Sequence, residues 1–152
     1  YTLVYTLSLH DALPISHLVN VADKMMKATL AKTLHSEGFK ITPEQYSILL
    51  SLWAKNGQCQ YELASCQGKD RASITRLIDS MEKENLVVRI PSENDRRIKL
   101  VYLTNKSKEL KPSLIEVATK ATSHATEGIQ HDKIQETKEV FKQIIENLNK
   151  SH

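Results

Sequence analysis

The side chains of this sequence that are best suited to binding chemistry are arginines and hydroxyl residues gathered in two short stretches. These candidate contact residues are Arg71, Ser73, Thr75 and Arg76 in the first stretch, and Asp95, Arg96, Arg97 and Lys99 in the second. An arginine can pair bidentately with guanine or with phosphate, and a hydroxyl can serve either a base or a phosphate. The residue types therefore indicate contacts to a nucleic acid.

A simpler interpretation stays open for each stretch alone, because a surface arginine is usually only solvated and an Asp-Arg-Arg turn can be a soluble loop. The distribution of charge favours the nucleic acid. Between Lys69 and Lys108 ten Lys and Arg stand against six Asp and Glu, whereas the rest of the 152 residues carries eleven bases and twelve acids. The excess positive charge of +3 thus lies entirely in the window that holds both stretches.

The elements that must position these residues begin with two helices. Apolar residues recur at helical spacing from Leu18 to about Glu37, and Gly38 is placed to end that helix. Thr42-Pro43-Glu44-Gln45 then has the pattern of a capping box with Pro at the first helical position, which predicts a helix to about Asn56. Its expected buried stripe is Tyr46, Leu49, Leu50 and Trp53.

Two short helices joined by a turn at Gly68 come next. The first covers Tyr61 to Cys66, and the second starts after Asp70 as its N-cap and ends at Asn85 in a left-handed C-cap. Ile74, Leu77, Ile78 and Met81 face the core in the second helix, so the first candidate stretch faces outward. This arrangement is typical of a helix-turn-helix with its recognition helix second.

The periodicity then changes to that of β-strands. Residues 86–90 and 98–103 are predicted strands, and the polar segment 91–97 between them makes a hairpin with Arg96 and Arg97 at its tip. A basic hairpin after a recognition helix can reach the minor groove beside it, as in a winged helix-turn-helix.

Long amphipathic helices are predicted after this hairpin. One begins at the N-cap Thr104, Gly128 interrupts it, and another continues to Leu148. The fold class is therefore mainly α with a small β-hairpin wing, and the long apolar stripes at both ends predict a homodimer. We expect one domain over residues 17–152, with dimerisation helices at 17–40 and 105–152 around a winged helix-turn-helix at 41–104.

Residues 1–16 are set apart from this pattern. They start without Met, contain no Lys or Arg, and over Tyr5 to Ile15 resemble translated sequencing-adapter DNA. We expect a non-native or disordered extension; the alternative is an apolar extension that packs on a partner subunit. The segment lacks the basic start of a secretory signal, and no apolar run is long enough to cross a membrane.

The sequence lacks the motifs of enzymes, of metal or cofactor sites, and of disulfide scaffolds. There is no phosphate-binding Gly-rich loop, nucleophile elbow or metal-ligand spacing, so no enzyme activity, metal or cofactor is expected. Cys59 and Cys66 have the spacing of neither a zinc site nor a disulfide scaffold, which favours a cytoplasmic protein with buried or half-buried thiols. The alternative function is a winged-helix protein interaction module without specific DNA binding.

The stretch from Ile41 to Leu110 resembles the DNA-binding core of the MarR (multiple antibiotic resistance regulator) family. The most specific motifs are RASITRLIDSMEKENLVVR and NDRRIKLVYLT, and with the flanking helices the resemblance covers about Leu18 to Leu148. It differs at Asn85 and Ser107, where the family usually has Gly.

The resemblance implies a dimeric winged-helix regulator of transcription, commonly a repressor released by a small molecule or by oxidation. It implies recognition-helix contacts at Ser73, Thr75 and Arg76, an Arg97 that enters the minor groove, and an Asp95 that helps to hold the wing. Oxidation-sensing relatives carry a Cys near the start of the first dimerisation helix, which is absent here, and zinc-sensing clusters are not seen either. A small organic effector is the remaining expectation, in the crevice between the winged domain and the dimerisation helices, with no residue assigned.

Overall fold

The computed structural model describes residues 14–150. The expectation for residues 1–16 lies outside the described residues except at its last three positions. Helix α2 (Ile15–Ser36) begins there, three residues earlier than the predicted start at Leu18, so the expected boundary after residue 16 falls inside a helix. Within residues 14–150 no helix has the length and apolar character that a membrane span requires.

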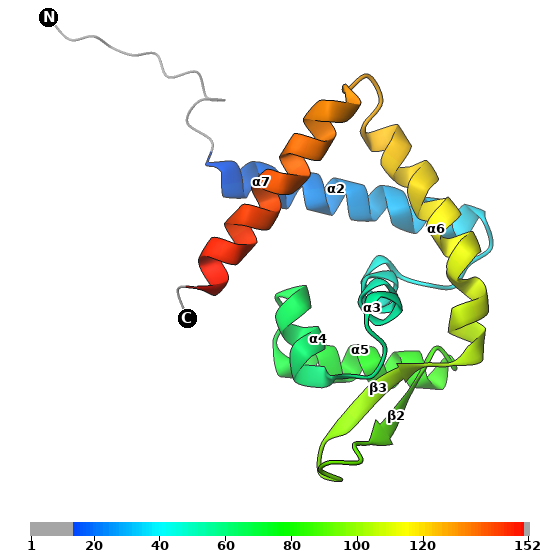
Figure 1. Cartoon of the computed structure of the whole chain (residues 1–152). Helices are drawn as coiled ribbons and strands as arrows, with labels where there is room; N and C mark the ends of the chain where they lie inside the picture. Colours follow the sequence, from blue (N-terminus) through cyan, green and yellow to red (C-terminus); the bar gives the residue numbers. More distant parts are fainter. Residues whose placement is uncertain (1–13, 151–152) are drawn as a thin grey trace, which may run out of the picture.

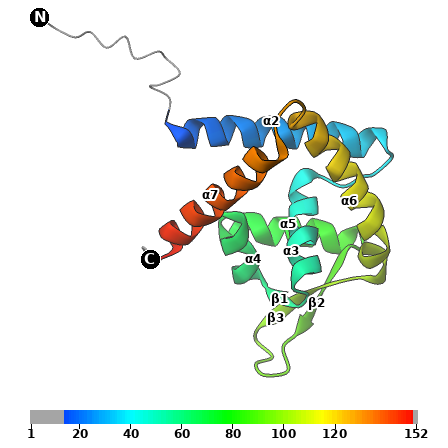
Figure 2. The same ribbon diagram turned by 45° about the horizontal axis from the view of Figure 1, so that its top comes forward.

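The order of the elements matches the predicted fold class, mainly α with a β-hairpin wing (Figure 1). After α2 come α3 (Pro43–Ala54), β1 (Gln58–Cys59), α4 (Gln60–Gln67), α5 (Arg71–Lys83), β2 (Val87–Pro91), β3 (Lys99–Leu103), α6 (Asn105–Ala125) and α7 (His131–Asn149). The hairpin of β2 and β3, residues 87–103, projects away from the helices, and it is called the wing below (Figure 2).

The predicted helix caps at Thr42, Asn85 and Thr104 are confirmed, because the hydrogen bonds and backbone angles that make them are local. The Gln45 N–H donates to the Thr42 hydroxyl at 3.2 Å, and the Thr42 N–H donates to the Gln45 side-chain oxygen at 3.0 Å, which is the expected capping box. Thr104 caps α6 in the same way through the N–H of Ser107. Asn85 has φ 58° and so takes the left-handed conformation that ends α5.

Ser107, which like Asn85 departs from the family pattern, is buried with its polar groups hydrogen-bonded. The Ser107 hydroxyl donates to the carbonyl oxygen of Leu86, while its own carbonyl oxygen accepts from the indole N–H of Trp53 at 3.3 Å. A buried hydroxyl with partners costs little, so Ser107 ties the start of α6 to the start of the wing.

The sheet has one strand more than predicted. β3 lies in the middle, with β2 antiparallel on one side and the two-residue β1 antiparallel on the other. Cys59 pairs with Leu100 across β1 and β3, and Val87 pairs with Leu103 across β2 and β3. A strand of two residues carries no alternation of apolar and polar positions, so the sequence offered no signal for β1.

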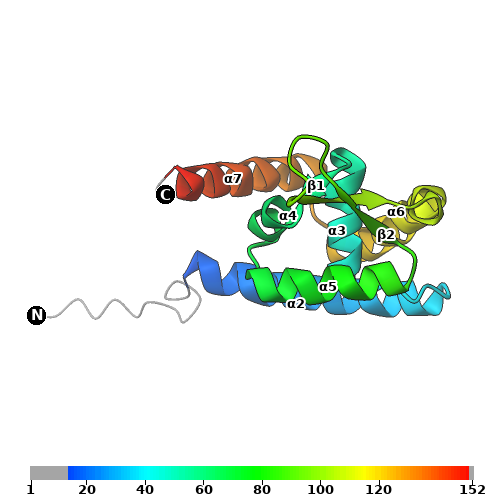
Figure 3. The ribbon, with the colours of Figure 1, turned by 90° about the horizontal axis from the view of Figure 1, so that it is seen from below.

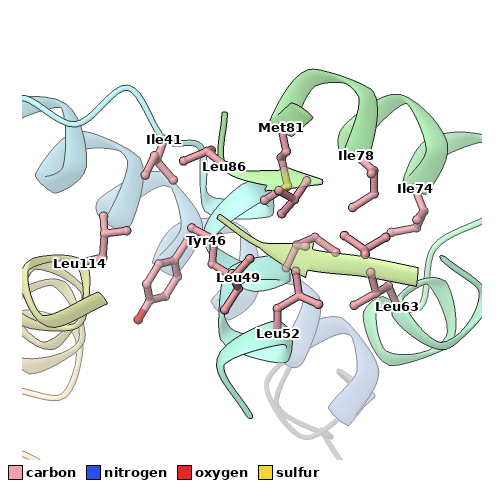
Figure 4. Packing of buried hydrophobic residues seen from close by; sticks show 14 of the residues in the cluster. Ile41, Tyr46, Leu49, Leu52, Leu63, Ile74, Ile78, Met81, Leu86 and Leu114 are labelled. Atoms are coloured by element: carbon pink, nitrogen blue, oxygen red, sulfur yellow. The ribbon is translucent and has the colours of Figure 1, made fainter. Parts of the chain in front are cut away.

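The core forms around α3, which contacts α2, α4, α5, α6 and β3 (Figure 4). The predicted stripe of α3 is therefore only partly right. Ile48 and Leu52 are completely buried, as is Leu49, but Leu50 is 43% exposed. A helix that is surrounded on several sides buries residues on more than one face. In α3 the side that no neighbour covers includes Leu50.

The terminal helices differ in how they pack. α2 lies along α6, which covers much of its C-terminal half. α7 crosses α2 in Figure 1, but Figure 3 shows the two helices on opposite sides of the molecule. None of the residues of α7 is buried, and Val140, Phe141, Ile145 and Leu148 are exposed apolar residues on it.

Candidate nucleic-acid interface

The recognition helix α5 begins with the predicted cap. The carboxylate of Asp70 accepts hydrogen bonds from the hydroxyl and the N–H of Ser73, at 2.6 and 2.8 Å. Because both bonds favour the ionised form, they hold the pKa of Asp70 below its usual value. An ionised carboxylate also interacts favourably with the positive end of the helix dipole. The first turn of α5 is thus stabilised by its N-cap residue Asp70.

Ser73 and Arg76 form a pair on the outer side of this first turn. Arg76 Nη2 donates to the Ser73 hydroxyl oxygen at 3.3 Å, while the Ser73 hydroxyl donates to Asp70. Arg76 is exposed and Ser73 is half-buried. Ser73 is therefore placed to orient the Arg76 guanidinium, which can reach outward from the helix.

Thr75 is more constrained than an outward helix position suggests. Its hydroxyl donates to the carbonyl oxygen of Arg71 at 2.9 Å and accepts from the Gln60 side-chain NH₂ of α4 at 3.0 Å. Thr75 is half-buried, whereas the Arg71 side chain at the start of the helix is exposed. The position expected to face solvent thus lies against the neighbouring helix on one side.

The wing carries the second group of candidate residues. At its tip Arg97 Nε and Nη2 donate to the two carboxylate oxygens of Asp95, each at 3.1 Å, and the Arg97 N–H donates to Asp95 at 3.0 Å. These hydrogen bonds lower the pKa of Asp95, the side-chain ones most. Arg96 and Lys99 are exposed beside the pair. The tip is therefore a hydrogen-bonded turn that presents cations.

A groove of about 870 Å³ brings half of the candidate residues together. Arg71 and Thr75 from α5 line it opposite Arg97 and Lys99 from the wing, and α4 forms its floor and side. We call this the basic groove, because its lining includes four cationic residues, Lys69, Arg71, Arg97 and Lys99, and no acidic one. A concave surface with one sign of charge concentrates anionic ligands such as nucleic-acid phosphates.

The other four candidates, Ser73, Arg76, Asp95 and Arg96, do not line the basic groove. Conversely, Gln60, Tyr61 and Lys69 line it without having been proposed as contacts. Tyr61 is 81% exposed, an unusual position for an aromatic residue. Its place at the start of a short helix before the turn was the signal in the sequence that could have identified it.

One residue of the basic window has a different role. Arg89 of β2 points inward, and its side chain, only 13% exposed, forms ion pairs with Asp79 and Glu82 of α5. Its Nε also donates to the Gln60 side-chain oxygen at 2.7 Å. Arg89 therefore joins the wing to α4 and α5, and its charge is taken up by two acidic residues instead of being offered to a ligand.

A second groove, of about 520 Å³, lies between α2, α3 and α6. Met26, Leu30, Leu50 and Ile115 give it mainly apolar walls, and Tyr46 lies at its base. We call it the apolar groove. It corresponds in place to the crevice that the sequence led us to expect between the winged domain and the dimerisation helices.

Cys59 contributes to the lining of the basic groove, whereas Cys66 lines neither groove. Both thiols are free; Cys59 is half-buried, as expected, but Cys66 is exposed. The expectation for Cys66 was wrong because α4 is so short that only Leu63 and Ala64 are covered by the core.

The comparisons with known proteins agree with this geometry. Residues 41–99, which run from the connection before α3 to the first residue of β3, match the family model described as the MarR family. The uncharacterized HTH-type transcriptional regulator YybA of Bacillus subtilis (strain 168) is 26% identical over 111 residues, which are 73% of this chain and 71% of that protein.

Solved structures share the fold over nearly the whole chain. The MarR transcriptional regulator of Methanosarcina mazei Go1 has a TM-score of 0.80 at 23% identity, covering 91% of this chain and 98% of that one. CouR of Rhodococcus jostii RHA1 bound to p-coumaroyl-CoA has a TM-score of 0.75 at 25% identity, covering 88% and 93%. The transcriptional repressor CouR bound to a 23-mer DNA duplex has a TM-score of 0.78 at 24% identity, covering 91% and 96%.

Proposed function

We propose that this chain is a transcriptional regulator of the MarR family and not an enzyme, and that it acts as a homodimer that binds a pseudo-palindromic site on double-stranded DNA. The observation that carries the proposal is the basic groove, in which the start of α5 and the wing present cations to one concave surface. In this arrangement α5 enters the major groove and the wing lies over the adjacent minor groove.

The positions of the exposed arginines on α5 and on the wing support this docking. Arg71 and Arg76 extend from the first turns of α5, the part of a recognition helix that meets base edges. Arg97 projects from the tip of the wing with its side chain 91% exposed, although Asp95 fixes the direction of its guanidinium. An arginine held in one direction loses less rotational freedom when it enters a narrow minor groove, where the negative potential is greatest.

The homodimer is supported by apolar surface on the terminal helices. α7 exposes Phe141, Ile145 and Leu148 at helical spacing, and the first half of α2 exposes Leu18 and Met25. Stripes of this size on a single chain are usually covered by a partner, and a two-fold axis lets the same stripes cover one another. Two recognition helices related by that axis meet successive major grooves on one side of the DNA.

The direct test is binding to the DNA next to the gene, measured by gel shift and footprinting. We expect protection of two half-sites about one helical turn apart and an affinity that falls steeply with salt. The alternative is a winged-helix protein interaction module. It would be supported if DNA binding depended on neither salt nor sequence and a protein ligand bound to α5.

The finer function that we propose is repression released by a small organic effector in the apolar groove. CouR supports this by analogy, since that repressor binds both DNA and p-coumaroyl-CoA. The groove touches α2, α3 and α6, so a molecule wedged in it can change the angle between the winged domain and the dimerisation helices. Such a change alters the spacing of the two recognition helices. A repressor of this kind acts in the cytoplasm.

The effector is tested with a panel of phenolic acids added to the gel shift. We expect at least one compound to release the DNA and to raise the melting temperature of the protein. Leu50→Gln, in the wall of the apolar groove, removes the response, whereas Ile129→Gln, at an exposed site in the α6–α7 turn, keeps it. Release that survives Leu50→Gln unchanged places the effector elsewhere.

A further inference from the structure

We propose that Gln60 is a positioning residue for sequence specificity, which holds the hydroxyl of Thr75 so that Thr75 offers DNA an acceptor and a methyl group but no donor. This inference rests on the proposed docking of α5 in the major groove. It assigns a role in base selection to a residue of α4 that lies outside the recognition helix.

Arg89, Gln60, Thr75 and Arg71 are linked by a series of hydrogen bonds whose donor-to-acceptor direction is set first at Arg89. Its guanidinium is held between Asp79 and Glu82, and its Nε donates to Gln60 Oε1 at 2.7 Å. A guanidinium can only donate hydrogen bonds, so the amide oxygen of Gln60 must face Arg89. The amide NH₂ of Gln60 then faces Thr75, at 3.0 Å from its hydroxyl oxygen.

The two hydrogen bonds of the Thr75 hydroxyl, with Gln60 and with Arg71, also have only one possible direction each. An amide NH₂ only donates, so the Thr75 oxygen accepts from Gln60. The single hydroxyl hydrogen of Thr75 is donated to the Arg71 carbonyl oxygen at 2.9 Å, and a carbonyl oxygen only accepts. Arg89 thus fixes the orientation of the Gln60 amide, and Gln60 together with the Arg71 carbonyl holds the Thr75 oxygen in one rotamer, with its hydrogen directed at Arg71.

Thr75 is left with one lone pair and its methyl group for any ligand in the basic groove, which it helps to line. The exocyclic amino groups of adenine and cytosine can donate to that lone pair, and the methyl group of thymine can pack against the methyl group of Thr75. Guanine presents only the acceptors N7 and O6 in the major groove. We therefore expect guanine to be disfavoured on the strand that Thr75 faces.

The test is to measure the base preference of the full-length dimer on duplexes with each half-site position randomised, by sequencing bound and free DNA. For the parent protein we expect guanine to be disfavoured at one position of each half-site by roughly three- to tenfold, the contribution of a single hydrogen bond. Gln60→Met keeps the length of the side chain but removes the hydrogen bond that holds the Thr75 oxygen in this rotamer. The Thr75 side chain can then turn about its Cα–Cβ bond, leave the Arg71 carbonyl and donate to guanine, so guanine becomes acceptable at that position alone.

Gln67→Met is the matched control. Gln67 is also in α4, and it also bonds to hydroxyls of another helix, with Ser51 at 3.2 Å and Ser47 at 2.6 Å, but it does not touch α5. We expect this variant to keep the parent preference at every position. Thr75→Val, which keeps the shape and the methyl group but removes the oxygen, should lose the discrimination against guanine even if Gln60→Met does not fold.

Three outcomes overturn the inference: a parent that accepts guanine throughout the half-site, a Thr75→Val variant that still rejects it, or the same relaxation in Gln60→Met and Gln67→Met. A parent that shows no sequence-specific binding in the same assay refutes the proposed function instead. The two failures are therefore distinguished by the parent protein alone.

Discussion

Arg97 and Asp95 pair at the tip of the wing, where two side-chain hydrogen bonds of 3.1 Å leave the Arg97 side chain 91% exposed. The carboxylate accepts both bonds and also the Arg97 N–H, so one acidic residue shapes the turn and aims the cation. Arg97 is therefore held by a bond within the wing itself, and an arginine that is already oriented loses less conformational freedom on binding.

The first prediction concerns the pH dependence of this turn. The folded pKa of Asp95 lies below its unfolded value, so its stabilising contribution is present above the unfolded pKa and is lost as the pH falls through the folded one. We expect an NMR titration of the Asp95 carboxyl group to show a midpoint below 3.8, the ordinary value, and Arg97→Ala to move that midpoint upward. An unchanged midpoint in the variant contradicts the pairing.

The second prediction concerns DNA affinity. Arg97→Ala should weaken operator binding by about tenfold or more and reduce the slope of log K against log salt by about one, because one cation leaves the interface. Lys40→Ala removes the same charge from an exposed position between α2 and α3 and should leave both quantities unchanged. Equal effects of the two substitutions, measured by fluorescence anisotropy at several salt concentrations, would mean that only overall charge matters.

The third prediction concerns stability. Arg89→Met breaks the ion pairs of Arg89 with Asp79 and Glu82, and we expect urea unfolding to show a loss of about 1–2 kcal/mol. The loss is modest because both acidic partners are partly exposed. Arg96→Met, the same change at the exposed tip of the wing, should cost much less. Equal stability of the two variants would show that Arg89 does not hold the wing to α5.

The fourth prediction concerns the homodimer. Ile145→Glu puts a charge into the exposed apolar stripe of α7, and we expect light scattering to show a shift of the molar mass toward that of one chain. Gln143→Glu adds the same charge on the opposite side of α7 and should remain dimeric. A dimer that tolerates Ile145→Glu at micromolar concentration would exclude this stripe as the interface.

Much of the fold was predictable because its signals are local. The cap at Thr42, the cap at Asp70, and the left-handed Asn85 each depend on hydrogen bonds or backbone angles within a few residues. The helical stripe of Ile74, Ile78 and Met81 was likewise read correctly, although Leu77 is only half-buried. All of these follow from spacing along one element.

The errors have a common cause, which is packing between distant segments. Leu50 was expected inside and lies outside, because the neighbours of α3 cover Ile48 and Leu52 instead. Cys66 was expected to be at least half-buried, yet it is exposed, because the buried residues of α4 end at Ala64. Nothing in the spacing of a single helix states how many neighbours will surround it.

The sequence by itself determined the order of the helices and of the hairpin strands, the caps at Thr42, Asp70 and Thr104, and the resemblance to a regulator family, since each depends on short-range hydrogen bonds or on residue types. Only the tertiary structure decided that Arg71 and Thr75 share a groove with Arg97 and Lys99. It alone turned Arg89 inward and placed Gln60 between it and Thr75. Contacts between residues far apart along the chain form only when all the elements pack together, so no local pattern encodes them.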